Sequence, residues 1–367
     1  MRPVLNIILC LVSIMVVCSC KEVYDPDEII SNEKIPVVLG NINAGDPPEV
    51  ILSWAIGFDN NKTSYIHDAQ VWITDDAGNY ENMEETMLGK YIPVNENFTG
   101  VMGRTYTLHV ETAEGDLYES TPERIYSGAQ LDSLFAVAVD RTRYIRTATG
   151  DLFPRPEEGL DIKLSLSKET DSTYYFRFKT DVLKEILYIV TVDDPLVDDT
   201  TTYLYEWQSS TRGDFYDVRY TYPGVLKQVV PEQYLGYLDF IYSPWLATEE
   251  RSAPLTYAWI ISAHVYSISE NVYRYYHSVE KQLDGKERIF APVPAQIETN
   301  LLCVNDYGKK IMGVFEATSE NVFYKAFHWI ESGKFKSKAL DSFPEDLGNG
   351  QILGDPPDFW ISFPEDQ

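Results

Sequence analysis

The residue with the clearest chemistry is Cys20, a thiol placed directly after an apolar segment at the start of the chain. Arg2 comes first, an apolar run extends from Val4 to Val17, and small residues precede the cysteine. A bacterial lipoprotein signal has this layout, because its peptidase needs narrow side chains before the cut and a thiol that carries diacylglycerol. The pattern predicts a signal peptide over residues 1–19 and a mature chain that begins at an acylated Cys20, with fatty acids such as palmitate as the anchor.

The apolar run is too short to remain in a membrane as a span. It has about fourteen residues, whereas a helix needs roughly 20 to cross the hydrocarbon core. Two other interpretations stay open, namely an ordinary secretory signal cut nearby and a core helix of a cytosolic protein. Lys21 and Glu22 open an acidic stretch after Cys20 that resembles the surface-export signal of Bacteroidota lipoproteins.

Side chains that could hold a metal or act as a nucleophile are scattered. Once the signal is removed and Cys20 is acylated, the remaining thiol is Cys303, which its apolar neighbours predict to be a small buried hydrophobe. The five histidines show no i, i+4 pair, so no metal site is predicted. One acidic cluster could hold calcium, although its spacing is not that of an EF-hand: it comprises Asp193, Asp194, Asp198 and Asp199.

No catalytic motif is present, and the chain is therefore predicted not to be an enzyme. It lacks a His-Glu-x-x-His helix, a phosphate loop and a Gly-x-Ser-x-Gly elbow. A glycosidase needs only two carboxylates at the right separation, but with 57 acidic residues no pair can be singled out. Exposed aromatic rings could instead stack on sugars, and the candidates are Trp72, Trp207, Trp245 and Trp360.

Charge and size limit the class of partner and the number of cores. The formal net charge of -27 repels phosphate backbones, which proteins bind through Lys and Arg. Nucleic acid is therefore an unexpected partner. With 367 residues, of which 44% are hydrophobic, the chain can build one large or two ordinary cores.

The elements that would position these residues are mainly strands. Residues 20–34 are charged and aperiodic and predict an acidic tether. Residues 35–127 contain short strands with alternating apolar side chains and a turn at Asp75–Asn79, which favours an immunoglobulin-like β-sandwich. Residues 128–367 predict a larger β-rich domain with at least one amphipathic helix.

Two segments of this second domain are the most informative. In Leu255–Ser267 every second residue from Leu255 to Val265 is apolar, which predicts a long strand, and Ser269 is a suitable N-cap for a helix that ends at Gly285. The helix carries an apolar stripe that is expected to be a packing face. Between Ser209 and Leu246 the chain is rich in Tyr and Pro without a clear period, and long loops are expected there.

Several segments occur in an order that resembles a known family. They are Lys34–Gly40, Ala69–Gly78, Gly103–Leu108, the helix with Tyr273 and Tyr276, Pro292–Asn300, Met312–Ala317 and Pro357–Trp360. Together they are similar to a Bacteroidota family of outer-membrane lipoproteins catalogued as domain of unknown function 4249. Relatives often have cysteines before the last segment, whereas Ser342–Gly354 contains none.

The resemblance implies a location and a role but no catalytic residues. It implies an exported β-sandwich lipoprotein held in the outer membrane by its N-terminal lipid, exposed at the cell surface, with an accessory or binding role beside a TonB-dependent receptor. A fimbrial or adhesive subunit is the first alternative, since such subunits are also acidic β-sandwich lipoproteins. A surface glycan or peptide hydrolase is the second.

Overall fold

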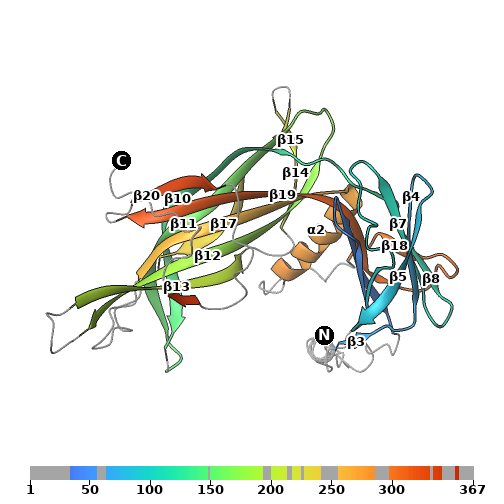
Figure 1. Cartoon of the computed structure of the whole chain (residues 1–367), viewed down its shortest axis with the longest axis horizontal. Coiled ribbons are helices and arrows are strands. Elements are labelled where there is room, and N and C mark those ends of the chain that lie inside the picture. Colours follow the sequence, from blue (N-terminus) through green and yellow to red (C-terminus); the bar gives the residue numbers. More distant parts are fainter. Residues whose placement is uncertain are drawn as a thin grey trace, which may run out of the picture.

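The computed structural model describes residues 34–55, 63–147, 149–192, 200–212, 217–224, 227–240, 255–285, 297–330, 334–340 and 352–354. Within these ranges the chain is mainly β with one helix, as the sequence predicts. The strands form two packed units that lie side by side (Figure 1).

The first unit is sandwich-like. Its strands are β1 (Pro36–Asn43), β2 (Glu49–Trp54), β3 (Ser64–Tyr65), β4 (Gln70–Asp75), β5 (Tyr80–Met87), β6 (Lys90–Pro93), β7 (Thr105–Glu111), β8 (Leu117–Ser120), β9 (Glu123–Arg124), β18 (Leu301–Cys303) and the first part of β19 (Met312–Ile330). Neighbouring strands form a ladder in the order β19-β1-β2-β6-β5-β4-β7-β8-β18. Alternate side chains enter one core, and in β7 the buried residues are Tyr106, Leu108 and Val110, as predicted.

A tight turn joins β4 to β5 where the sequence predicts one. The Oδ1 atom of Asp75 accepts hydrogen bonds from the backbone N–H groups of Ala77 and Asn79 at 2.9 and 2.8 Å. Gly78 has φ 85°, a left-handed conformation that costs a glycine little. The carboxylate and the glycine together fix the register of the two strands.

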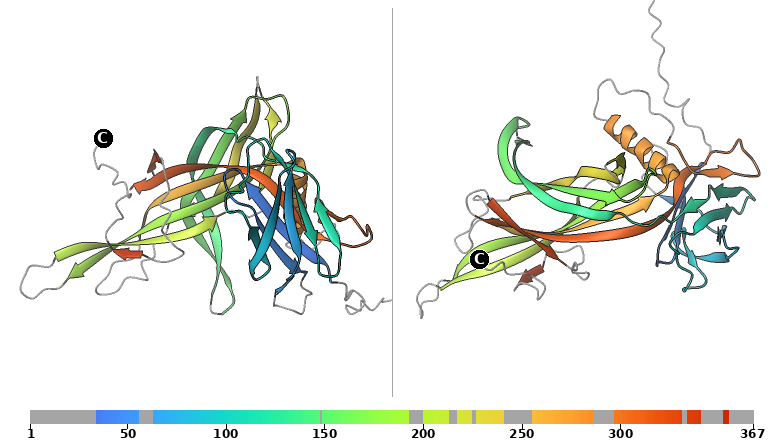
Figure 2. Two further views of the ribbon diagram at one scale, coloured as in Figure 1. Left: turned by 45° about the vertical axis from the view of Figure 1, so that its right-hand side comes forward. Right: turned by 90° about the horizontal axis from the view of Figure 1, so that it is seen from above.

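The second unit consists of two facing sheets with long, curved strands (Figure 2). One sheet contains β10 (Gln130–Arg146), β11 (Leu152–Lys168), β15 (Tyr222–Pro223) and β16 (Gln228–Asp239). The other contains β12 (Tyr175–Val192), β13 (Thr200–Arg212), β14 (Val218–Tyr220), β17 (Leu255–Ile268), β20 (Lys334–Leu340), β21 (Ile352–Gly354) and the second part of β19. The alternation predicted for β17 is confirmed, because Trp259, Ile261, Ala263 and Val265 all enter the core between the sheets.

The loops predicted between Ser209 and Leu246 are wrong in part, since β14, β15 and β16 lie there. The sequence pattern does not predict β16, because its pairing with β11 contains two register shifts. These shifts place its buried residues at irregular intervals, with Val230, Gln233, Leu235 and Leu238 facing inward. A bulged strand of this kind loses the period of two on which sequence patterns depend.

Strand β19 belongs to both units. Met312–Thr318 pairs in parallel with β1, and the following residues, Ser319 to His328, pair antiparallel with β17. Gly313 permits the first contact, because a Cβ atom there would lie 1.9 Å from the carbonyl oxygen of Val38. The predicted boundary near residue 127 falls between β9 and β10, and the structure adds β18 and the start of β19 to the first unit.

Helix α2 (Glu270–Gly285) begins and ends where the sequence predicts. Ser269 caps it, since the N–H of Val272 donates to its Oγ atom at 3.2 Å. Val272 and Tyr276 are buried in a small core that also contains Val218 of β14 and Val314 of β19. The helix therefore packs on the sheet of the second unit close to the junction with the first (Figure 1).

Candidate functional site

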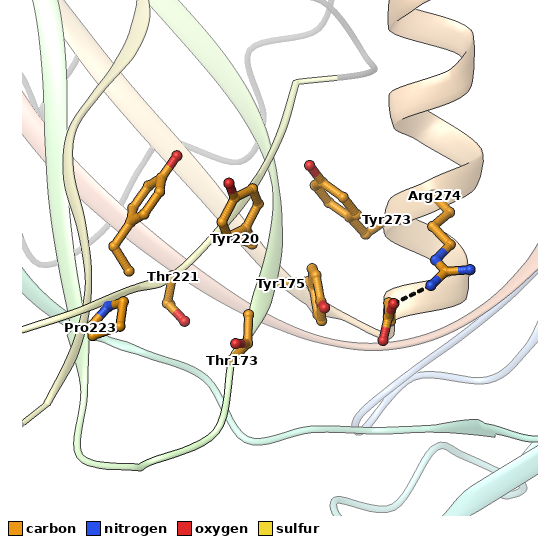
Figure 3. Close-up of a pocket in the computed structure, with 9 residues that line it drawn as sticks. Thr173, Tyr175, Tyr220, Thr221, Pro223, Tyr273 and Arg274 are labelled. Carbon is orange, nitrogen blue, oxygen red and sulfur yellow. Dashed lines mark hydrogen bonds and ion pairs between the residues drawn. The ribbon is translucent and has the colours of Figure 1, made fainter.

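A pocket lies between the start of helix α2 and strands β12, β14 and β15 (Figure 3). Its volume is about 370 Å³, and it is lined by Thr173, Tyr175, Tyr220, Thr221, Tyr222, Pro223, Glu270, Tyr273 and Arg274. This size is within the usual range for small-molecule sites. We refer to it as the tyrosine pocket.

Four tyrosine rings form a continuous wall of the pocket. The ring centroids of Tyr222 and Tyr220 are 4.9 Å apart, Tyr220 and Tyr273 are 6.0 Å apart, and Tyr273 and Tyr175 are 5.0 Å apart. Tyr220 and Tyr222 keep 39% and 46% of their surface exposed. The pocket therefore offers apolar ring faces and hydroxyl groups side by side, which suits a ligand with an apolar face and a polar rim.

Local structure explains why these rings point into the pocket. Thr221 is buried and its backbone N–H donates to the carbonyl oxygen of Tyr174 at 2.8 Å. Its two neighbours, Tyr220 and Tyr222, therefore lie on the opposite side of the strand. On the helix, Tyr273 lies one turn after Glu270, at the edge of the buried face, where it is half-buried against the small core of Val272 and Tyr276.

An ion pair forms one edge of the pocket. Arg274 donates to the carboxylate of Glu270 at 2.5 Å across one helical turn. The hydroxyl of Tyr175 is held protonated, because burial, the negative charge of Glu270 and a hydrogen bond to that carboxylate raise its pKa. Since the two charges compensate each other, the pocket presents hydrogen-bond donors and acceptors without a net charge.

A second cluster has the outline of a catalytic triad. Nε2 of His264 lies 2.9 Å from Oγ of Ser262, and its Nδ1 atom contacts the carboxylate of Glu320. However, Asp181 also approaches Nε2, at 3.2 Å. Burial alone would lower the pKa of His264, but the hydrogen bonds and charges of Asp181 and Glu320 raise it.

The electrostatics of this cluster oppose nucleophilic catalysis. The two carboxylates favour the charged form of His264 by raising its pKa, whereas a general base must be neutral to accept the proton of Ser262. Ser262 is also only 2% exposed. The cluster is a charged structural contact between β12, β17 and β19, and the tyrosine pocket remains the better candidate for function.

The described residues contain no group of three or more His, Cys, Asp or Glu side chains that could hold a metal ion. The acidic cluster predicted for calcium, between Asp193 and Asp199, lies outside the described residues. Cys303 is buried and unpaired with another thiol, in agreement with its predicted packing role. Its Sγ atom donates to Oδ1 of Asn305 at 3.1 Å.

Most of the sequence-predicted site residues lie outside the described ranges: Cys20, Lys21, Glu22, Trp245 and Trp360. Trp207 belongs to β13, where only the backbone is described. Trp72 lies on β4, half-buried, and stacks on His109 with a centroid distance of 5.1 Å and an angle of 5°. A sugar-stacking role for these tryptophans stays a prediction.

Sequence reasoning missed the tyrosine pocket, although one signal could have indicated it. The apolar stripe of the helix includes Tyr275 and Tyr276, and Tyr273 lies at its border. An aromatic residue at the border of an apolar stripe, where one side of the ring is left uncovered, is a candidate for ligand contact. The other walls come from strands far away in the sequence, which no local pattern connects.

No described helix has the length and apolar character needed to cross a membrane. Neither the curated proteins nor the solved structures provide a match to the chain. One family model does match, over residues 21–322, and its description is Domain of unknown function (DUF4249). Because this match covers most of the 367 residues, the chain belongs to that family.

Proposed function

We propose that the protein is a lipid-anchored binding protein of the outer membrane of a Bacteroidota cell. In this proposal Cys20 carries the acyl anchor and the β-rich body faces the cell surface. The body captures a small ligand in the tyrosine pocket and delivers it to a TonB-dependent transporter beside it. The lipoprotein signal predicted around Cys20 and membership of the DUF4249 family support a location in the outer membrane.

The observation that carries the binding role is the tyrosine pocket itself. Its wall of four rings comes from three separate parts of the chain, β12, the β14–β15 region and α2, and each ring contacts the next. Rings that restrain one another in this way lose less side-chain freedom when a ligand binds, which favours affinity. The described residues that line it include no nucleophile beside a base, so binding fits them better than hydrolysis.

The charge balance of the pocket favours one class of ligand. Glu270 and Arg274 neutralise each other, while the tyrosine rings and the exposed hydroxyl of Thr173 remain to make contacts. A neutral ligand with an apolar face and several hydroxyl groups, such as a mono- to trisaccharide, matches this surface. The ligand would stack on Tyr220 and Tyr222 and accept hydrogen bonds at the Arg274 edge.

Binding can be tested with the purified mature chain and a panel of mono- to trisaccharides, with dipeptides as the comparison class. We expect a saccharide to raise the melting temperature, and the paired substitution Tyr220→Ala/Tyr222→Ala to reduce its affinity at least about tenfold. Tyr307→Ala is the matched control, because this tyrosine is 83% exposed and lies outside the pocket. Equal affinity of all three proteins would overturn the assignment of the pocket.

The transporter partnership needs a separate experiment. A tagged full-length chain is expressed in its own cells, and membranes are solubilised in detergent and passed over the affinity resin. We expect a TonB-dependent receptor to be recovered with it. Consistent failure to recover any such receptor, with the tagged protein itself present, would contradict the accessory role.

A further inference from the structure

Tyr273 is the central ring of the tyrosine pocket. Its ring centroid lies 5.0 Å from that of Tyr175 and 6.0 Å from that of Tyr220, and Figure 3 shows it between helix α2 and Tyr220. A further ring, outside the pocket lining, packs on it: His277, one helical turn later, stacks on Tyr273 with a centroid distance of 5.4 Å and an angle of 19°. The orientation of the Tyr273 ring therefore depends on what holds His277.

Two polar contacts connect His277 to strand β14. Its Nδ1 atom lies 3.2 Å from Oε2 of Glu280, which is one turn further along the helix. The other carboxylate oxygen of Glu280, Oε1, lies 3.5 Å from Nη1 of Arg219. Arg219 belongs to β14 and directly precedes Tyr220. These contacts thus join the helical wall of the pocket to the strand that carries another wall.

Asp217 holds Arg219 against the two sheets of the second unit. Its Oδ1 atom lies 3.1 Å from Nη1 of Arg219, and its Oδ2 atom accepts a hydrogen bond from Nε2 of Gln233 at 2.7 Å. Gln233 is buried in β16 of one sheet. The backbone carbonyl of Asp217 accepts from the N–H of Phe178, in β12 of the other sheet, at 2.9 Å. We call Asp217, Arg219, Glu280 and His277 the clamp; none of the four lines the pocket.

The exposure of the clamp indicates that stability is not its main contribution. The side chains of Arg219, Glu280 and His277 keep 41%, 28% and 37% of their surface exposed. Ion pairs exposed to this extent add little to the free energy of unfolding. Their effect on the arrangement of the pocket can be larger, because a ring that is free to move must be ordered again each time a ligand binds.

We propose that Arg219, Glu280 and His277 are positioning residues of the tyrosine pocket. His277 holds the ring of Tyr273 in one orientation, Glu280 orients His277, and Arg219 keeps Glu280 at a fixed distance from the strand of Tyr220. The clamp thereby fixes the spacing of the two walls without touching a ligand. Its effect on affinity rests on the proposed function, whereas its effect on the Tyr273 ring does not.

The orientation of Tyr273 can be measured without a ligand. The mature chain carries 3-fluorotyrosine at position 273 alone, and its ¹⁹F NMR spectrum is recorded. We expect one narrow resonance for the parent and a broadened or second resonance for Glu280→Ala, which removes the link between His277 and Arg219. His277→Phe keeps a ring beside Tyr273 but cannot reach Glu280 through a polar contact, so it should resemble Glu280→Ala. A parent-like spectrum for both variants would overturn the proposal.

The effect on affinity is measured by calorimetry with maltotriose, cellotriose and xylotriose as probes. Glu280→Ala and Arg219→Ala should each reduce the affinity for the best-binding probe by about three- to tenfold, while the melting temperature stays close to that of the parent. Lys163→Ala is the matched control, because it breaks another partly exposed ion pair of the second unit, 3.0 Å from Glu232 and outside the pocket. It should keep the affinity of the parent.

The results distinguish failure of the clamp from failure of the proposed function. If none of the three probes binds the parent, saccharide binding is removed and the ¹⁹F spectra alone decide the clamp. If a probe binds Glu280→Ala as well as the parent but no longer binds Tyr220→Ala/Tyr222→Ala, the pocket stands and the clamp is overturned. A large fall of the melting temperature in both clamp variants would also overturn the proposal, since it would show a general structural role.

Discussion

Arg177 of β12 and Glu316 of β19 form a buried ion pair, with Nη2 of the arginine 3.1 and 3.3 Å from the two carboxylate oxygens. The guanidinium also lies over the rings of Tyr266 and Tyr276, 4.3 and 5.1 Å from their centroids. The hydroxyl of Tyr276 donates to Glu316 at 3.3 Å. One buried pair thus ties helix α2 to the two strands near the point where β19 passes from one unit to the other.

Removing one partner of this pair should destabilise the protein strongly. Arg177→Met leaves the carboxylate of Glu316 buried without its cation, and the free energy of unfolding should fall by about 3–5 kcal/mol. Arg177→Met/Glu316→Leu removes both charges and should cost less than Arg177→Met alone. Urea unfolding of the parent, both single variants and the double variant measures the coupling. Additive losses in this cycle would show that the two side chains do not act as a pair.

The cap of helix α2 should contribute measurably to stability. Ser269→Ala removes the hydrogen bond to Val272, and the free energy of unfolding is expected to fall by about 1 kcal/mol. Ser269→Asp should preserve most of the stability, because aspartate also caps helices well. Urea unfolding of the three proteins gives the comparison. A loss in the aspartate variant as large as that in the alanine variant would argue against capping as the cause.

The charged cluster of His264 should make stability depend on pH. The pKa of His264 is raised in the folded protein: burial opposes the charge, but contacts with Asp181 and Glu320 favour it more strongly. Its contribution is therefore complete below the unfolded value of about 6.5 and is lost as pH rises through the higher folded value. The stability difference between the parent and His264→Gln should shrink between pH 6 and pH 9, as followed by urea unfolding. A difference that stays constant over this range would contradict the assignment.

The carboxyl group of Glu320 in the same cluster should give stability the opposite dependence on pH. A hydrogen bond with His264 is the largest influence on Glu320 and, against the effect of burial, lowers the pKa of this carboxyl. Its contribution is present above the unfolded value of 4.5 and is lost as pH falls through the folded value. Glu320→Gln should therefore lose less stability than the parent when the pH is lowered from 5 to 3.

Glu185 of β12 should destabilise the folded state at alkaline pH. It is fully buried, and neither carboxylate oxygen has a hydrogen-bond partner among the described residues. Burial raises its pKa to about 8. The folded state thus holds a proton that the unfolded state releases between pH 4.5 and 8, so stability falls as pH rises through this window.

An isosteric neutral side chain should remove this loss. Glu185→Gln is expected to be more stable than the parent at pH 8.5, by an amount on the order of a few kcal/mol, and similar to it at pH 5. Thermal unfolding at the two pH values measures the difference. Parallel pH profiles for parent and variant would show that Glu185 stays ionised in the fold.

The acyl anchor should depend on one sulfur atom. Cys20→Ser removes the thiol that carries diacylglycerol in the proposed function, so we expect the protein to leave the membrane fraction and its N-terminal peptide to lose the acyl mass. Cell fractionation with mass spectrometry of that peptide provides the measurement. A variant that keeps the acyl mass would disprove the assignment of Cys20.

The sequence predicts those parts of the fold in which local pattern and tertiary environment agree. Alternation in β7 and β17 and the Ser269 cap each specify an element within a few residues of its position in the structure. β16 is an exception, because the bulges in its pairing with β11 interrupt the alternation of buried and exposed side chains, and its sequence therefore resembles that of a loop. A sequence pattern predicts a strand where buried and exposed side chains alternate without interruption. It does not predict a strand in which a bulge inserts an extra residue and shifts the alternation.

The candidate site is harder to predict because it is a property of the assembled fold. Tyr175, Tyr220 and Tyr273 come from segments about fifty residues apart, and each alone resembles a packing residue. Of the tryptophans predicted to stack on sugars, Trp72 lies in the first unit, where its ring stacks on His109. Tyrosine is ambiguous in a sequence, since its ring suits a core and its hydroxyl suits a surface.

The pairing of β1 with β19 sets the order in which the chain can finish folding. Val37 lies beside Met312, so β1 cannot complete its ladder until β19, which is synthesised much later, is available. Until then one side of the first core stays open to water or to chaperones, which slows folding and prolongs exposure to aggregation. In the proposed function the chain is exported before it folds, and this delay would keep the first unit incomplete until almost all of the chain has crossed the membrane.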